Sequence, residues 1–139
     1  MSGYLLDTNV ISESRKKNCN PNVRRWLERQ KPSDLFCSSV VFAEITYGIN
    51  QVEDLSFRHD LNYWVDNVLR IWFAGRTLEV DEQTIVKWRE MAQKGRSKNY
   101  TFGQPDLFIA AQAAIHGLCV VTRNVKDFEK AEVAVFNPW

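Results

Sequence analysis

Short apolar runs alternate with longer helix-like segments along this chain, and this alternation constrains the fold more than any other feature. Residues 4–6, 35–38 and 118–121 are apolar at nearly every position, so the strands they form must be buried on both faces. Strands of this kind occur in parallel sheets that are covered by helices on each side. We therefore expect an α/β fold with a central parallel sheet of about five strands flanked by helices.

Local signals set the order of the elements. We expect strands at residues 3–7, 35–38, 78–80, 118–121 and 133–136, helical turns from residue 8 to about 13, and helices at residues 23–30, 40–51, 61–72, 82–94 and 104–117. Asn20, Ser39 and Asp81 are predicted to cap helices, and Gly117 to end one. The clearest periodicity is one apolar helical stripe, formed by Leu61, Trp64, Val65, Val68, Leu69 and Trp72.

Size and charge indicate an ordinary globular protein. The 139 residues are expected to form a single domain, residues 1–139, with 45% hydrophobic and 25% charged residues. The net charge of +1 argues neither for nor against a polyanionic partner, so any nucleic-acid contact requires a local basic patch. Lys94, Arg96, Lys98 and Tyr100 form such a segment. The alternative is a solvated helix end and loop.

Three cysteines and the absence of a long apolar run indicate the cellular setting. Cys19, Cys37 and Cys119 form no CxxC pair, and two of them lie in strand-like runs, which favours a reducing compartment. No run approaches the ~20 apolar residues of a membrane span, and the N-terminus lacks a signal-peptide pattern. We expect a cytoplasmic protein without membrane contact. His59 and His116 lie on different predicted helices and indicate no zinc site.

Acidic and polar residues stand where predicted strands end and helices begin. Asp7 ends the first strand, Glu44 interrupts an apolar helix, Asp106 opens another helix, and Asn124 follows the fourth strand with Asp127 close behind. Functional groups of parallel sheets collect at this edge. Carboxylates brought together there would repel and take up protons unless a cation lay between them. Oxygen ligands favour Mg²⁺ or Mn²⁺.

Each of these residues also has an ordinary structural explanation. Asp7 could cap the helix that follows it, and Asp106 could sit in a first helical turn because the helix dipole favours a negative charge there. Glu44 could lie on an exposed helix face. Asn124 could cap the next turn, and Asp127 could be a surface charge. The combination, in this strand–helix order, is what favours a site.

Five sequence blocks carry a resemblance to a known family. They are LDTNVISE at 6–13, SVVFAEI at 39–45, DLFIAA at 106–111, TRN at 122–124 and VAVFNPW at 133–139. In this order, and spread over nearly the whole chain, they resemble the PIN-domain ribonucleases of the VapC toxin type, especially the FitB-like branch. The resemblance implies a PIN-like fold and an acidic pocket that binds Mg²⁺ or Mn²⁺ for hydrolysis of RNA phosphodiester bonds.

The resemblance also assigns roles to residues. Asp7, Glu44 and Asp106 would be the metal-binding catalytic acids, with Asn124 at the fourth catalytic position, which is often Asp in this family. The supporting residues would be Thr8, Asn9, Thr122 and Asp127. Asn124 accepts hydrogen bonds but adds no charge, so a second metal ion would be held less tightly. Lys94, Arg96, Lys98, Tyr100 and Arg123 would contact the RNA.

A VapC-type protein is the toxin of a type II toxin–antitoxin module. The resemblance therefore implies tRNA or rRNA as substrate, inhibition by a VapB-like antitoxin, operator DNA bound only through the antitoxin complex, and a homodimer. Two alternatives remain. The chain could be a catalytically weak PIN module that acts through antitoxin and operator binding, or a phosphotransfer or phosphatase domain with Asp7 as nucleophile.

Overall fold

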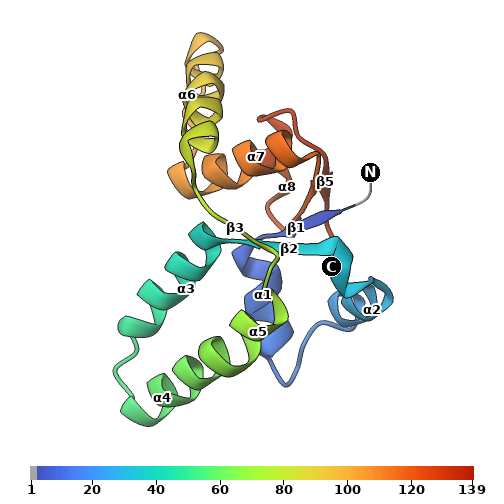
Figure 1. Ribbon diagram of the computed structural model, residues 1–139, viewed down its shortest axis with the longest axis vertical. Coiled ribbons are helices and arrows are strands. Elements are labelled where there is room, and N and C mark those ends of the chain that lie inside the picture. The colour runs from blue at the N-terminus through green and yellow to red at the C-terminus, as the bar shows by residue number, and fades with distance from the viewer. Residues whose placement is uncertain (1–2) are drawn as a thin grey trace.

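The computed structural model describes residues 3–139, which form a five-stranded parallel sheet with helices on both faces (Figure 1). The strands are β1 (Tyr4–Leu6), β2 (Leu35–Ser38), β3 (Thr77–Leu78), β4 (Cys119–Val121) and β5 (Val135–Phe136). The helices are α1 (Thr8–Arg15), α2 (Pro21–Arg29), α3 (Ser39–Asn50), α4 (Leu55–Trp64), α5 (Arg70–Trp72), α6 (Glu82–Ser97), α7 (Gln104–His116) and α8 (Val125–Glu129), with a 3-10 turn η1 (Pro32–Asp34) and a π-helical turn η2 (Val65–Leu69). The predicted fold class is confirmed.

The chain adds strands first on one side of β1 and then on the other, so the strand order reverses at the centre of the sheet. The order is β3-β2-β1-β4-β5, and β1 pairs with both β2 and β4, so that Leu5 lies between Phe36 and Val120. Helices α1 to α5 lie on one face of the sheet, and α6 to α8 lie on the other (Figure 1). A crevice outside the carboxyl ends of strands at such a reversal is the usual ligand site of an open parallel sheet.

The two central strands are buried on both faces, as their apolar sequences predict. Leu5, Leu6, Val120 and Val121 are fully buried. Because neither face of these strands reaches water, helices must cover both, and burial of the apolar surface is the main force holding the layers together. The carboxyl edge between β1 and β4 is therefore a fixed platform.

Most predicted helix ends are confirmed. Asn20 and Asp81 accept hydrogen bonds from the first backbone N–H groups of α2 and α6, and Gly117 ends α7 with a left-handed φ of 64°. The Ser39 prediction is wrong by one residue. Ser38 has the extended backbone of a cap and accepts a 3.0 Å bond from the backbone N–H of Val40, whereas Ser39 is already helical.

The predicted stripe at residues 61–72 is interrupted by η2. Leu61, Val65 and Leu69 are buried, but Val68 is 48% exposed. A π-helical turn has more residues than an α-helical turn, so Val68 is rotated away from the core. Phe73, directly after α5, is fully buried.

Helix α6 extends beyond its predicted end near Lys94 to Ser97. Gly95 lies within the helix, where it serves close packing. A Cβ at Gly95 would lie 2.6 Å from a ring carbon of Phe102 and 2.9 Å from the carbonyl oxygen of Tyr100. Asn99, with a left-handed φ of 60°, turns the chain after the helix. Lys94 and Arg96 are thus helical residues rather than loop residues.

Two further predictions concern the whole chain. Within residues 3–139, no helix combines the length and apolar character needed to span a membrane. Cys19, Cys37 and Cys119 are free thiols. Burial raises the pKa of the Cys37 thiol to about 12, so this thiol stays protonated.

Candidate active site

Asp7 is the anchored acid of the site. It follows β1 directly, is 4% exposed, and its backbone N–H donates to Val121 at 3.0 Å. The pairing of Leu6 with Val121 puts Thr122 beside it. Asp7 Oδ1 accepts from the backbone N–H of Thr8 at 2.8 Å, and Oδ2 accepts from the Thr122 hydroxyl at 2.8 Å. With both oxygens oriented and little exposed surface, this carboxylate suits a ligand better than a nucleophile.

Asn9 and Thr122 join the loops after β1 and β4. The Asn9 amide donates to Thr122 Oγ1 at 3.2 Å, and Asn9 Oδ1 accepts from the backbone N–H of Arg123 at 3.3 Å. The backbone N–H of Asn124 also donates to Thr122 Oγ1, at 3.0 Å. Asn124 stands at the N-cap position of α8, but its side chain forms no capping bond and is exposed. Three of the predicted supporting residues, Thr8, Asn9 and Thr122, thus belong to one hydrogen-bonded network around Asp7.

Glu44 reaches the same edge from α3. Its carboxylate is exposed, and Oε1 accepts a 2.9 Å hydrogen bond from the Thr8 hydroxyl. Thr8 therefore touches two acids, because its backbone N–H binds Asp7 while its hydroxyl binds Glu44. The Glu44 side chain thus extends from α3 to the start of α1.

Asp106 is the acid most affected by its neighbours. It lies half-buried in the first turn of α7, where the helix dipole favours a negative charge. Its pKa is nevertheless raised to about 6, first by burial and then by the negative charges of Asp7, Asp127 and Glu44. Desolvation and repulsion therefore outweigh the dipole. The structure brings these four carboxylates within electrostatic reach of one another.

Asp127 takes part in this cluster although its side chain is exposed. It lies in the first turn of α8, accepts a 3.4 Å hydrogen bond from the Tyr100 hydroxyl, and raises the pKa of both Asp7 and Asp106. Burial is the largest cause of the raised pKa of Asp7. Asp127, rather than Asn124, supplies negative charge at this corner.

The donor set fits a hard divalent cation. Every candidate ligand is an oxygen, and none of the ion pairs among residues 3–139 involves Asp7, Glu44, Asp106 or Asp127, so their charge is uncompensated. In the same part of the chain, no three Asp, Glu, His or Cys side chains are arranged to hold an ion directly. Mg²⁺ commonly keeps several waters and uses one or two carboxylates, and this arrangement suits such partly hydrated binding.

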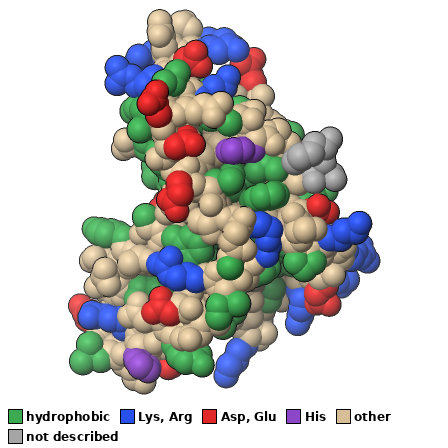
Figure 2. Space-filling model, in the orientation of Figure 1, with side chains coloured by type: hydrophobic (Ala, Val, Ile, Leu, Met, Phe, Trp, Pro, Cys, Tyr) green, Lys and Arg blue, Asp and Glu red, His purple; other side chains and the backbone are tan. Residues whose placement is uncertain are grey.

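The predicted RNA contacts are spread over three places. Lys94 pairs with Glu132, and Lys98 lies at the end of α6. Arg96 lines a separate hollow of about 180 Å³ beside Trp88. Figure 2 shows Lys and Arg side chains gathered at the far end of α6. The basic segment is thus divided between two faces of one helix.

Tyr100 and Arg123 lie nearer the acids. The Tyr100 hydroxyl reaches Asp127, as described above, and the Arg123 guanidinium stacks 5.2 Å from the ring centre of Trp139. Sequence reasoning missed Lys130, whose amine lies 4.1 Å from the ring centre of Tyr100. Its position three residues after Asp127, on the same face of a short helix, was the available signal.

The chain matches known proteins over nearly its full length. The PIN domain matches residues 4–133. Toxin FitB of Neisseria gonorrhoeae is 33% identical over 97% of both chains. VapC ribonuclease Y4jK of Sinorhizobium fredii is 30% identical over 97% of this chain and 96% of its own. The solved structure of FitAB bound to an IR36 DNA fragment matches 98% of this chain and 95% of that chain, with 32% identity and a TM-score of 0.91. This chain belongs to the PIN-domain family.

Proposed function

We propose that this protein is the toxin of a type II toxin–antitoxin module and an Mg²⁺- or Mn²⁺-dependent endoribonuclease. The observation that carries the proposal is the cluster of uncompensated carboxylates at the reversal between β1 and β4, where Asp106 has a pKa of about 6. Similarity to a toxin and to a named VapC ribonuclease supports the same activity. Structured RNA, such as tRNA or rRNA, is the proposed substrate.

The side chains divide the work of the site. Asp7 and Asp106 would bind the cation directly. Glu44 and Asp127 would accept hydrogen bonds from water molecules bound to the cation, or contact the substrate through such waters. When bound, the cation lowers the pKa of water and neutralises charge on the scissile phosphate. Thr8 and Thr122 hold two of the acids in place through their hydroxyl groups. Asp106 must lose its proton for binding, so activity should rise with pH through about 6.

Cleavage by the purified, antitoxin-free protein tests this activity. The wild type should cut structured RNA with Mg²⁺ or Mn²⁺ and stop on chelation, and Asp7→Asn should be inactive yet folded. Asp60→Asn, the same change at an exposed position on α4, is the matched control and should cut normally. If the wild type cut no RNA with either metal, the nuclease proposal would be wrong and a catalytically weak module would replace it.

Cellular cleavage sites would identify the target. We expect induction of the protein in bacteria to create new 5′ ends in tRNA or rRNA, and induction of Asp7→Asn to create none. New ends distributed evenly over messenger RNA would contradict a structured target. This experiment assumes the cytoplasmic location that we propose.

The protein partners follow from the same assignment. We propose a VapB-like antitoxin, operator DNA bound only through its complex, and a homodimer; the similar FitAB structure contains DNA. Hydrophobic side chains that are exposed on α3, α4 and α5 support a partner surface; they are Tyr47, Leu55, Phe57, Tyr63 and Ile71. Light scattering should give a dimer for the isolated chain, and a monomer would contradict this part.

A further inference from the structure

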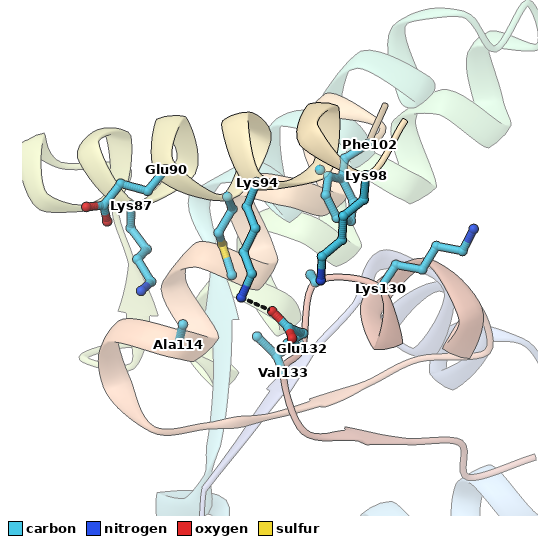
Figure 3. Close-up of a pocket in the computed structure, with 12 residues that line it drawn as sticks. Lys87, Glu90, Lys94, Lys98, Phe102, Ala114, Lys130, Glu132 and Val133 are labelled. Atoms are coloured by element: carbon cyan, nitrogen blue, oxygen red, sulfur yellow. Dashed lines mark hydrogen bonds and ion pairs between the residues drawn. The ribbon is translucent and has the colours of Figure 1, made fainter. Parts of the chain in front are cut away.

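A basic pocket lies beside the acid cluster and is not explained by it. The pocket has a volume of about 240 Å³ and is formed by α6, α7 and the turn after α8 (Figure 3). Four lysines line it, Lys87, Lys94, Lys98 and Lys130, with two glutamates, Glu90 and Glu132. The pocket thus carries a formal charge of +2, which is more than the +1 of the whole chain.

Three of these lysines form a row along α6. Lys87, Lys94 and Lys98 follow the spacing i, i+7, i+11 of one helix face, and Figure 3 shows their amines directed across the cavity. Lys94 pairs with Glu132. Lys98 also acts on this acid, because it helps to lower the pKa of Glu132. Among residues 3–139, Lys87, Lys98 and Lys130 form no ion pair.

The floor of the pocket is apolar. It contains Met91, Phe102 and Val133. The missing Cβ of Gly95 lets Phe102 pack against α6, and Tyr100 meets Phe102 edge-on with ring centres 4.7 Å apart. Cations above an apolar, aromatic floor are the features with which proteins hold the phosphates and bases of single-stranded nucleic acid.

A single aromatic ring separates this pocket from the acids. Lys130 lies over one face of Tyr100, and the hydroxyl of the same ring reaches Asp127, which is coupled to Asp7 and Asp106. An extended polynucleotide bound at the acids would therefore reach the pocket within a few nucleotides. An acidic peptide would also carry negative charge, but it would need neither the aromatic floor nor a continuous path from the acids to the pocket.

We propose that the pocket holds a flanking nucleotide from a single-stranded segment of the RNA bound at the acids, with its base on the apolar floor and its phosphates near Lys98 and Lys130. Glu132 then competes with the RNA for Lys94. The proposal rests on the proposed function and adds where the substrate runs. Removing Glu132's charge should strengthen binding, an effect that a purely structural Lys94–Glu132 pair would not give.

Binding in an inactive background tests the proposal. All variants carry Asp7→Asn, and the probe is a fluorescent single-stranded RNA of about 12 nucleotides, a typical length for one binding surface. Lys98→Gln with Lys130→Gln should weaken binding roughly tenfold at low salt and reduce the salt slope by about 0.7 per lost phosphate contact. Glu132→Gln should tighten binding. Lys31→Gln, an exposed change ahead of β2 at the opposite end of the strands, is the matched control.

Varying the length of the RNA distinguishes a subsite for a flanking nucleotide from an independent site for phosphate. The difference in affinity between the Asp7→Asn protein and its double lysine variant should vanish for a dinucleotide, which is too short to reach both the acids and the pocket. An equal loss for dinucleotide and longer RNA would indicate independent phosphate binding and overturn the proposal. Unchanged affinity and salt slope for every RNA would also overturn it and leave the lysines to an acidic protein partner.

Cleavage assays with intact Asp7 distinguish this proposal from the function on which it rests. If the wild type cleaves RNA and the double lysine variant has a raised KM, both stand. If both proteins cleave with the same KM, the pocket proposal fails and the nuclease remains. If the wild type does not cleave, the nuclease proposal fails and the pocket proposal fails with it.

Discussion

Asp7 and Asp106 belong to one acid cluster but are held in different ways. Asp7 is buried at the end of β1. One of its carboxylate oxygens accepts a hydrogen bond from the Thr8 backbone N–H, and the other accepts one from the Thr122 hydroxyl. Among residues 3–139, the Asp106 carboxylate has no such donors, and the charges around it raise its pKa to about 6. Backbone pairing thus holds Asp7 in place, whereas Asp106 is left with charge repulsion that a bound cation would offset.

The largest effect should come from removing either acid. Asp7→Asn and Asp106→Asn should each lower the rate of RNA cleavage by about 10³-fold, the order expected when one preorganised charged group is lost. Initial rates at saturating Mg²⁺ measure this, with circular dichroism as the check on folding. A loss for Asp7 alone would mean that α7 contributes no part of the chemistry.

Changes at Asp127 and Asn124, the two candidates for the fourth catalytic position, should give the next largest effect. Asp127→Asn should reduce cleavage by about 10- to 100-fold, as for other groups that tune a metal site from outside, because Asp127 is coupled to Asp7 and Asp106. Asn124→Ala should lose less. The reverse order of the two losses, measured at subsaturating Mn²⁺, would return the fourth position to Asn124.

The hydrogen bonds that orient Asp7 and Glu44 can be removed without changing either acid. Thr122→Val keeps the volume of the side chain but removes the hydroxyl that donates to Asp7, and Thr8→Val removes the donor to Glu44. We expect losses of roughly tenfold in metal affinity or rate, larger for Thr122 because it is fully buried. Equal activity of Thr122→Val and wild type would show that Asp7 needs no anchor.

The smallest effect should appear in stability. Asp106 has a pKa of about 6 in the fold and an ordinary value of 3.8. The folded form therefore binds the proton more tightly, and the free energy of unfolding falls as pH rises from about 4 through 6. In a chelator, Tm should be a few degrees higher at pH 5 than at pH 7. Asp106→Asn should reduce this difference, and an unchanged difference would exclude Asp106 as its source.

The sequence predicted the sheet and the converging acids because both follow from local rules. Runs such as 118–121 are apolar on both faces, and the carboxyl ends of parallel strands must share one edge. The exposure of Val68 was not predictable because the π-helical turn of η2 has no local signal in this chain. The contacts of Asp127 were also missed, since they depend on Tyr100 from a distant loop.

Calorimetric titration with Mg²⁺ or Mn²⁺ tests directly whether a cation binds among these acids. We expect the antitoxin-free wild type to bind the ion near pH 6 with release of a proton, because Asp106 is partly protonated there. Asp106→Asn should abolish the proton release, and Asp7→Asn should weaken binding. An absence of binding by the wild type, or equal binding by Asp7→Asn, would contradict a cation held among these acids.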